Sequence, residues 1–237
     1  MTEYRKSVIV DSMGNEDILS LLGEDIAFLQ HKIDDNIKTY RKLARSSMKK
    51  ERVFYKPLNY KSARGFNYVI QFFKRGVDEE QKDKLGIIYY TWFVKNRGIY
   101  AILFSRSSAQ GRSFWRYTIY TPHFLDRYRE RFLKDITISK PDVIHRYVIN
   151  NLKTTLTGHP SEKYPNSIWV LCSDGLCLCN HINGFNLEAK TFVTFDMAGL
   201  ERQQFIEKAK GAMQMNGFEF SLPEDDFNEY VEETSYL

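Results

Sequence analysis

The chain of 237 residues is 43% hydrophobic and 27% charged, an ordinary globular composition that excludes wholesale disorder. Its longest apolar run, residues 87–94 with one threonine, is far shorter than the roughly 20 residues of a membrane span. The N-terminal residues lack the apolar stretch of a secretion signal, and three cysteines do not make a disulfide framework. We therefore expect a cytoplasmic protein that does not enter a membrane.

Charge is distributed unevenly along the chain, whose net charge is +4. Residues 1–160 contain 29 basic and 17 acidic residues, whereas residues 161–237 contain 5 basic and 13 acidic ones. The last segment, Glu224–Leu237, has six acids and no base. This asymmetry indicates a polyanionic partner, with nucleic acid and RNA in particular favoured over an acidic protein. Two other interpretations stay open: a solvated basic face, or a basic half that the acidic half masks.

The first predicted element is a long helix over Glu16–Ser46. Apolar residues recur there in steps of three and four, from Ile18 and Leu22 to Tyr40 and Leu43, and no proline interrupts them. This stripe favours packing within the chain and leaves self-association through the helix as an alternative.

An antiparallel meander follows a basic connector at Ser46–Lys61. Aromatic and β-branched residues with intervening turn signals predict its strands, and Ser105–Gly111 is predicted to be a loop. The predicted strands are Asn67–Phe73, Gly86–Val94, Ile99–Phe104 and Ser113–Tyr120.

Two helices and a second antiparallel sheet are predicted next. The first helix covers His123–Leu133 after Thr121 and Pro122, and the second runs from Pro141 to about Leu156 with Ser139 as its cap. The predicted later elements are a hairpin of Ser167–Cys172 and Leu176–Asn180 turning at Asp174-Gly175, a strand at Lys190–Phe195, and a helix at Leu200–Met213.

These elements predict an α+β fold: a long N-terminal helix and an antiparallel meander, then a helix–helix–antiparallel sheet unit. We place the domain boundaries at residues 1–120, 121–215 and an acidic tail of 216–237, with a single domain as the alternative near residue 120.

One residue cluster indicates a specific chemistry. At 100° per residue, His123, Arg127, Glu130 and Arg131 share a stripe less than a third of the way round the helix. Arginine binds phosphate oxygens bidentately, and histidine or a carboxylate transfers protons near neutral pH. The cluster therefore predicts a metal-independent site for RNA cleavage, with His123 as proton shuttle, Glu130 assisting it, and both arginines as phosphate clamps. The alternative is a solvated helix face of i,i+3 and i,i+4 ion pairs.

The pattern His-x3-Arg-x3-Arg on a helix before a small sheet resembles toxin-like domains of the RelE/barnase/EndoU/colicin ribonuclease assemblage. The resemblance extends from Thr121 to about Asp196, roughly a third of the chain. It implies metal-free RNA cleavage with His123, Arg127 and Arg131 at the site, and Thr191 or Thr194 lining it.

Further residues have side chains that could bind nucleic acid or a metal ion. Arg112, Arg116 and Arg129 are predicted to contact nucleic acid, with Phe114 and Tyr120 as a stacking platform; the alternative is that these aromatic residues are core. The three cysteines and His181 have ligand chemistry, but a flat strand keeps residues 177 and 181 about 13 Å apart, too far for one zinc ion. We therefore expect no metal and no cofactor. A non-catalytic nucleic-acid-binding or adaptor protein stays the alternative function.

Overall fold

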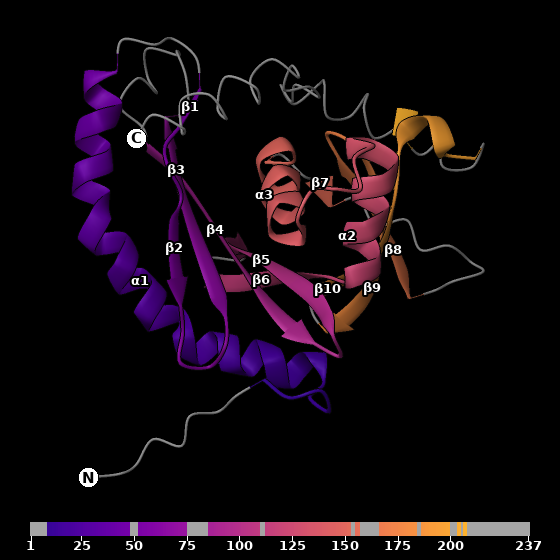
Figure 1. The fold of residues 1–237 in the computed structure, drawn as a ribbon, viewed down its shortest axis with the longest axis horizontal. Helices are drawn as coiled ribbons and strands as arrows, with labels where there is room; N and C mark the ends of the chain where they lie inside the picture. The colour runs from indigo at the N-terminus through magenta and orange to yellow at the C-terminus, as the bar shows by residue number, and fades with distance from the viewer. Residues whose placement is uncertain are drawn as a thin grey trace. The chain divides into compact units, whose positions relative to one another are not determined.

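The computed structural model describes residues 9–47, 52–74, 85–109, 112–152, 155–156, 166–183, 186–199, 203–204 and 206–207, with backbone only for 105–114 and 155–156 (Figure 1). The chain divides into two compact units, between Asn96 and Arg97. The acidic tail and most of the predicted helix Leu200–Met213 lie outside the described residues.

The first unit combines one long helix with a small antiparallel sheet. β3 pairs antiparallel with β4 on one side and with both β1 and β2 on the other. The elements are α1 (Asn15–Ser46), β1 (Val53–Phe54), β2 (Leu58–Lys61), β3 (Asn67–Lys74) and β4 (Leu85–Lys95). The predicted basic connector thus contains two short strands, β1 and β2, whose backbones pair with β3.

α1 packs on its own sheet, as its apolar stripe predicts. Ile18, Leu22 and Leu29 are 1–2% exposed, and the helix contacts β3 and β4. A polar anchor reinforces this packing, because the buried carboxylate of Asp25 accepts from the hydroxyl of Tyr68 at 3.1 Å and pairs with Arg64. Self-association through α1 stays a prediction.

The second unit contains a mixed sheet in the order β5-β6-β10-β9-β8-β7. All its pairs are antiparallel except β6 with β10, which run parallel with Leu187 opposite Thr118. Its strands are β5 (Gly98–Ala109), β6 (Arg112–Tyr120), β7 (Thr155–Leu156), β8 (Ser167–Cys172), β9 (Gly175–Asn183) and β10 (Asn186–Val193). Its helical elements are α2 (Pro122–Tyr128), the π-helical turn η2 (Arg129–Leu133), α3 (Lys140–Asn150) and the 3-10 turn η3 (Phe195–Met197).

Both faces of this sheet carry apolar packing. α2 and α3 pack together on one face (Figure 1). The rings of Phe124 and Tyr147 contact the ring of Tyr120 there, at 5.0 and 4.9 Å between centroids. The other face forms a second cluster of Trp169, Leu171, Leu176, Ala198 and Ile206. Tyr120 is 5% exposed, which confirms the interpretation of this aromatic residue as core.

The hairpin of β8 and β9 turns one residue earlier than predicted. Cys172 pairs with Gly175, so that Ser173 and Asp174 form the turn, and Gly175 is the first residue of β9. The Asp174 carboxylate explains the shift, because it accepts from the hydroxyl of Tyr128 at 2.6 Å and from the amide of Asn151 at 2.8 Å. These tertiary bonds outweigh the local preference of Asp174-Gly175 for the two central positions of the turn.

Other predicted boundaries were also wrong. The strand predicted at Lys190–Phe195 is β10 at Asn186–Val193, and Phe195 begins the turn η3. α3 ends at Asn150 instead of near Leu156, because the side chain of Asn151 bonds back to the carbonyl of Tyr147 at 2.9 Å and the chain then enters β7. Residues 105–109 belong to β5 and are not a loop, because they pair with residues 112–116 of β6. Polar sequence does not prevent a strand whose backbone groups are paired.

The α+β fold class is confirmed, with β6 and β10 as a parallel strand pair. The predicted seam near Tyr120 stays a prediction; in the structure, β6 and α2 on either side of it belong to one unit. In the part of the chain that the structure describes, the helices do not combine the length and apolarity that crossing a membrane demands.

Gly175 provides a test of the packing between β9 and β10. A Cβ there would lie 2.7 Å from Cζ of Phe192 and even closer to the carbonyl oxygen of Val193. We expect Gly175→Ala to lower the free energy of unfolding by about 1–3 kcal/mol, as overpacking does. Gly23→Ala is the matched control, because a Cβ at Gly23 in α1 meets no atom within 4 Å. It should raise stability by about 0.5–1 kcal/mol. Urea denaturation measures both; a neutral Gly175→Ala would contradict the packing.

Candidate functional site

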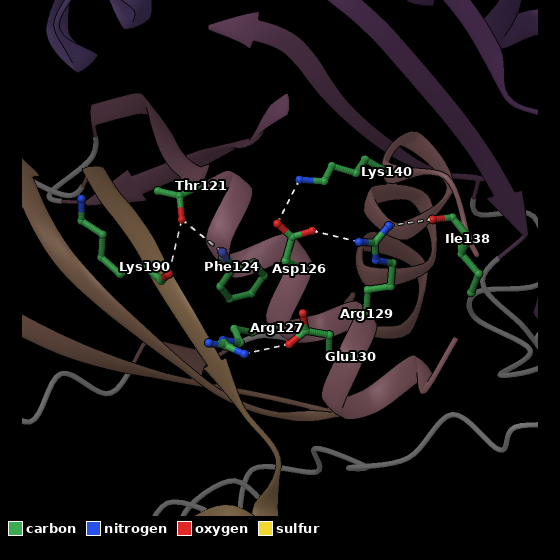
Figure 2. Close-up of polar contacts among 9 residues, drawn as sticks. All are labelled: Thr121, Phe124, Asp126, Arg127, Arg129, Glu130, Ile138, Lys140 and Lys190. Carbon is green, nitrogen blue, oxygen red and sulfur yellow. Dashed lines mark hydrogen bonds and ion pairs between the residues drawn. The ribbon is translucent and has the colours of Figure 1, made fainter. Parts of the chain in front are cut away.

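α2 is fixed on β10 at its first turn. The Thr121 hydroxyl accepts from the backbone N–H of Phe124 at 3.2 Å, which confirms the predicted cap. The same hydroxyl donates toward the carbonyl of Ala189 at 3.1 Å. It also lies 3.3 Å from the carbonyl of Lys190 (Figure 2). The pairing register of β10 shifts between Ala189 and Thr191, so this irregularity lies where the helix begins. The position of α2 is therefore set by main-chain atoms of β10.

Packing of its apolar side determines which face of α2 turns outward. Phe124 and Tyr128 are fully buried, and their rings meet Phe192 of β10 edge-on at 6.0 and 5.0 Å between centroids. Burial, followed by the nearby Asp174 carboxylate, raises the pKa of the Tyr128 hydroxyl well above its ordinary value. Tyr128 therefore donates to Asp174 as a neutral phenol, and this bond holds the helix on the hairpin.

The helix changes to a π-helical turn after Tyr128, which the sequence analysis missed. η2 covers Arg129–Leu133, and Lys134 follows with a positive φ of 51°. A π turn contains one more residue than an α turn, so the side chains after Tyr128 do not keep 100° spacing. As a consequence, Arg131 points to β10, where its Nη1 donates to the carbonyl of Phe192 at 2.5 Å. Arg131 thus attaches η2 to the sheet.

Arg129 lies in a second set of bonds on another side of α2. Its Nη2 donates to Asp126 at 3.1 Å and its Nη1 to the carbonyl of Ile138 at 3.2 Å, while Lys140 binds the other oxygen of Asp126 at 3.0 Å (Figure 2). These bonds connect α2 with the start of α3. Arg129, predicted to contact nucleic acid, therefore already has protein acceptors.

Arg127 and Glu130 remain together on the outer side of the helix (Figure 2). Arg127 Nη1 lies 2.8 Å from Glu130 Oε2, and the two side chains are 39% and 42% exposed. His123 is also exposed, and among the described residues its imidazole has no hydrogen-bond partner. The structure thus brings together two members of the predicted cluster, keeps His123 one helical turn before Arg127, and directs Arg131 elsewhere.

Of the two predicted nucleic-acid ligands on β6, Arg116 has a described side chain and Arg112 does not. Arg116 is half-buried opposite Ser105 of β5, and burial lowers the pKa of its guanidinium. The side chains of Arg112 and Phe114 lie outside the described residues, so the stacking platform stays a prediction.

The cysteines form part of the core under α3. Cys172, Cys177 and Cys179 are about fully buried free thiols, with 3.8 Å between Sγ of Cys172 and Sγ of Cys177. Tyr147 lies above them, its hydroxyl 3.2 Å from Sγ of Cys177. Burial raises the pKa of Cys172 and of Cys179, which keeps these thiols protonated and unreactive. In the described part of the chain, no three His, Cys, Asp or Glu side chains are arranged so that they could hold a metal ion.

No protein-family model, curated protein or solved structure matches this chain. Function therefore has to be inferred from the geometry of the site.

Arg127 and Arg131 should respond differently to substitution. Arg131→Gln removes a charged donor from the carbonyl of Phe192 and should lower the free energy of unfolding by about 1.5–3 kcal/mol. Arg127→Gln breaks an exposed ion pair and should change it by less than about 1 kcal/mol. Urea denaturation of both variants checks this; equal losses would contradict the separation of structural and exposed arginines.

His145 of α3 should make stability depend on pH. Burial lowers its pKa from 6.5 to about 4, so the folded protein holds this imidazole neutral where the unfolded chain protonates it. Stability should therefore fall as pH decreases from 6.5 to about 4, by up to about 3 kcal/mol, and show no such change above pH 6.5. Urea denaturation across this range tests it. His145→Gln should remove that part of the slope; an unchanged slope in the variant would contradict the burial.

Proposed function

We propose that the protein binds RNA through phosphate contacts on the outer face of α2, with Arg127 as the phosphate ligand. The observation that supports this most is the placement of Arg127. Among the described residues its guanidinium has one partner, the exposed carboxylate of Glu130, whereas Arg129 and Arg131 donate to carbonyl groups of the protein. Arg127 is therefore available to a ligand, and its neighbours hold it in position.

A phosphate group can replace Glu130 on Arg127 at small cost. Exposed ion pairs contribute about 0.2–1 kcal/mol, because both partners stay hydrated. A phosphate offers the planar guanidinium two acceptor oxygens and a stronger charge-assisted contact. The uneven charge of the sequence is consistent with a polyanion as the ligand.

RNA cleavage without a metal is the second candidate function, and the pairing of Arg127 with Glu130 is the observation that favours it. A phosphate on Arg127 would have the Glu130 carboxylate on one side and the imidazole of His123, one helical turn away, on another. Cleavage would join the ribose 2′ oxygen to phosphorus and break the bond from phosphorus to the 5′ oxygen. One group would take the 2′ proton and the other would protonate the leaving oxygen. The resemblance to toxin-like ribonucleases stays a prediction, and Arg131 has no part in this version of the clamp.

Titration of fluorescein-labelled single-stranded RNA, followed by anisotropy over a range of salt concentrations, tests the binding. We expect affinity to fall steeply with salt as counterions are released. Arg127→Gln should weaken binding about fivefold at about 0.1 M salt, the share of one phosphate contact on a single strand. Arg97→Gln is the matched control, because Arg97 is also exposed and lies outside α2. Equal effects of the two substitutions would remove the assignment to α2.

Incubation in excess EDTA with end-labelled single- and double-stranded RNA tests the cleavage. The proteins compared are the unmodified protein, Arg97→Gln, His123→Ala and Arg127→Ala. Cleavage by the unmodified protein and by Arg97→Gln, lost in His123→Ala and in Arg127→Ala, would establish the site. Binding with intact RNA in every reaction would exclude cleavage of these RNAs and leave the protein as a non-catalytic binder.

A further inference from the structure

Four basic side chains form a stripe on the last part of α1. They are all exposed and occupy an arc of about 100° on the helix, at spacings of three and four residues. The members of this stripe, which we call the basic stripe, are Lys38, Arg41, Lys42 and Arg45. Its first and last residues are about 10 Å apart along the helix axis.

In the described part of the chain, no acidic side chain neutralises the basic stripe. Among the described residues none of its four side chains has a hydrogen bond or ion pair. The nearest acids of α1 are Asp34, which accepts from Gln30 at 2.9 Å, and Asp35, which lies 3.6 Å from His31. Both acids therefore interact with the preceding turn of the helix, and the stripe keeps its positive charge.

The helix dipole accounts for only part of the stripe. Basic residues are favourable at a helix C-terminus, but the effect is confined to the last turn. Arg45 lies in that turn of α1, which ends at Ser46, whereas Lys38 and Arg41 lie earlier. The dipole therefore does not account for Lys38 and Arg41.

Packing of the remaining surface of α1 holds the stripe toward solvent. Leu29, Ile33 and Ala44 are 5% exposed or less, and the ring of Tyr40 stacks on Phe72 of β3 at 4.3 Å between centroids. Because this side of the helix is anchored, the basic side chains cannot turn inward to find partners.

We infer that the basic stripe is a second surface for RNA, which binds successive phosphates of one strand. Its four charges are spread over about 10 Å along one side of the helix, so that they can neutralise more than one phosphate of a strand. Interfaces with nucleic acid are strongly positive, whereas protein interfaces have cores depleted of charge and rich in aromatic residues. This inference rests on the proposed function for the identity of the ligand, and it adds a contact surface on the first unit.

Substitution of the stripe tests the inference in the full-length protein. Lys38→Gln/Lys42→Gln/Arg45→Gln removes three charges and keeps residues that favour a helix. Anisotropy with fluorescein-labelled single-stranded RNA should show a salt slope smaller by about 2, and an affinity weaker by between about tenfold and about 100-fold at about 0.1 M salt. The charge-conserving variant Lys38→Arg/Lys42→Arg/Arg45→Lys should bind like the unmodified protein. Circular dichroism verifies that both variants keep the helix.

A control for total charge removes three exposed basic side chains outside the stripe, in Lys56→Gln/Lys61→Gln/Arg97→Gln. This control should weaken binding much less than the stripe variant; an equal loss would overturn the inference. Displacement of the RNA by poly-glutamate at equal charge concentration would also overturn it, in favour of an acidic polypeptide as the partner.

The outcomes separate this inference from the proposed function. If the unmodified protein binds RNA and Arg127→Gln weakens it while the stripe variant does not, the inference fails and the proposed function stands. If the stripe variant loses affinity and Arg127→Gln does not, the stripe is a binding surface and the assignment to α2 fails. If the unmodified protein does not bind RNA, both are overturned.

Discussion

The attachment of α2 and η2 to β10 is the constraint on which the candidate site depends. Thr121 bonds to the carbonyls of Ala189 and Lys190, and Arg131 bonds to the carbonyl of Phe192. Between these points, Phe124 and Tyr128 bury their rings against Phe192. A helix held at both ends and along its apolar side has one orientation. Because the other sides of the helix are packed or bonded to the sheet, the side that carries Arg127 and Glu130 faces solvent.

This attachment also divides the basic residues of the segment into two kinds. Arg129 and Arg131 contribute hydrogen bonds to the fold, and their removal would take a charged donor from the carbonyls of Ile138 and Phe192. Arg127 contributes little to stability, because its one ion pair is exposed to water. The basic stripe on α1 is of the second kind. A side chain that the fold does not use is the one that is available to a ligand, and both proposals follow from this distinction.

The polar network under the helices has a structural role. Asp174 accepts from Tyr128 and Asn151, and burial raises the pKa of its carboxyl. Because each bond joins a different element to the hairpin of β8 and β9, the network specifies how α2 and α3 sit on the sheet. The buried thiols beside it fill space in the same core. Neither group offers the exposed charge that a phosphate contact requires.

The sequence by itself determined the elements whose signals are local. Periodicity and capping chemistry act between near neighbours in the chain. They predict the apolar stripe of α1, the caps at Thr121 and Ser139, and most strands. The charge asymmetry can be counted from the sequence directly, and the pairing of Arg127 with Glu130 follows from their spacing of three residues. Tertiary structure decided the turn at Ser173-Asp174, the π turn after Tyr128, the orientation of Arg131 and the parallel pairing of β6 with β10. Each of these depends on bonds between residues far apart in the chain, whose energy exceeds the small preferences that a local pattern records.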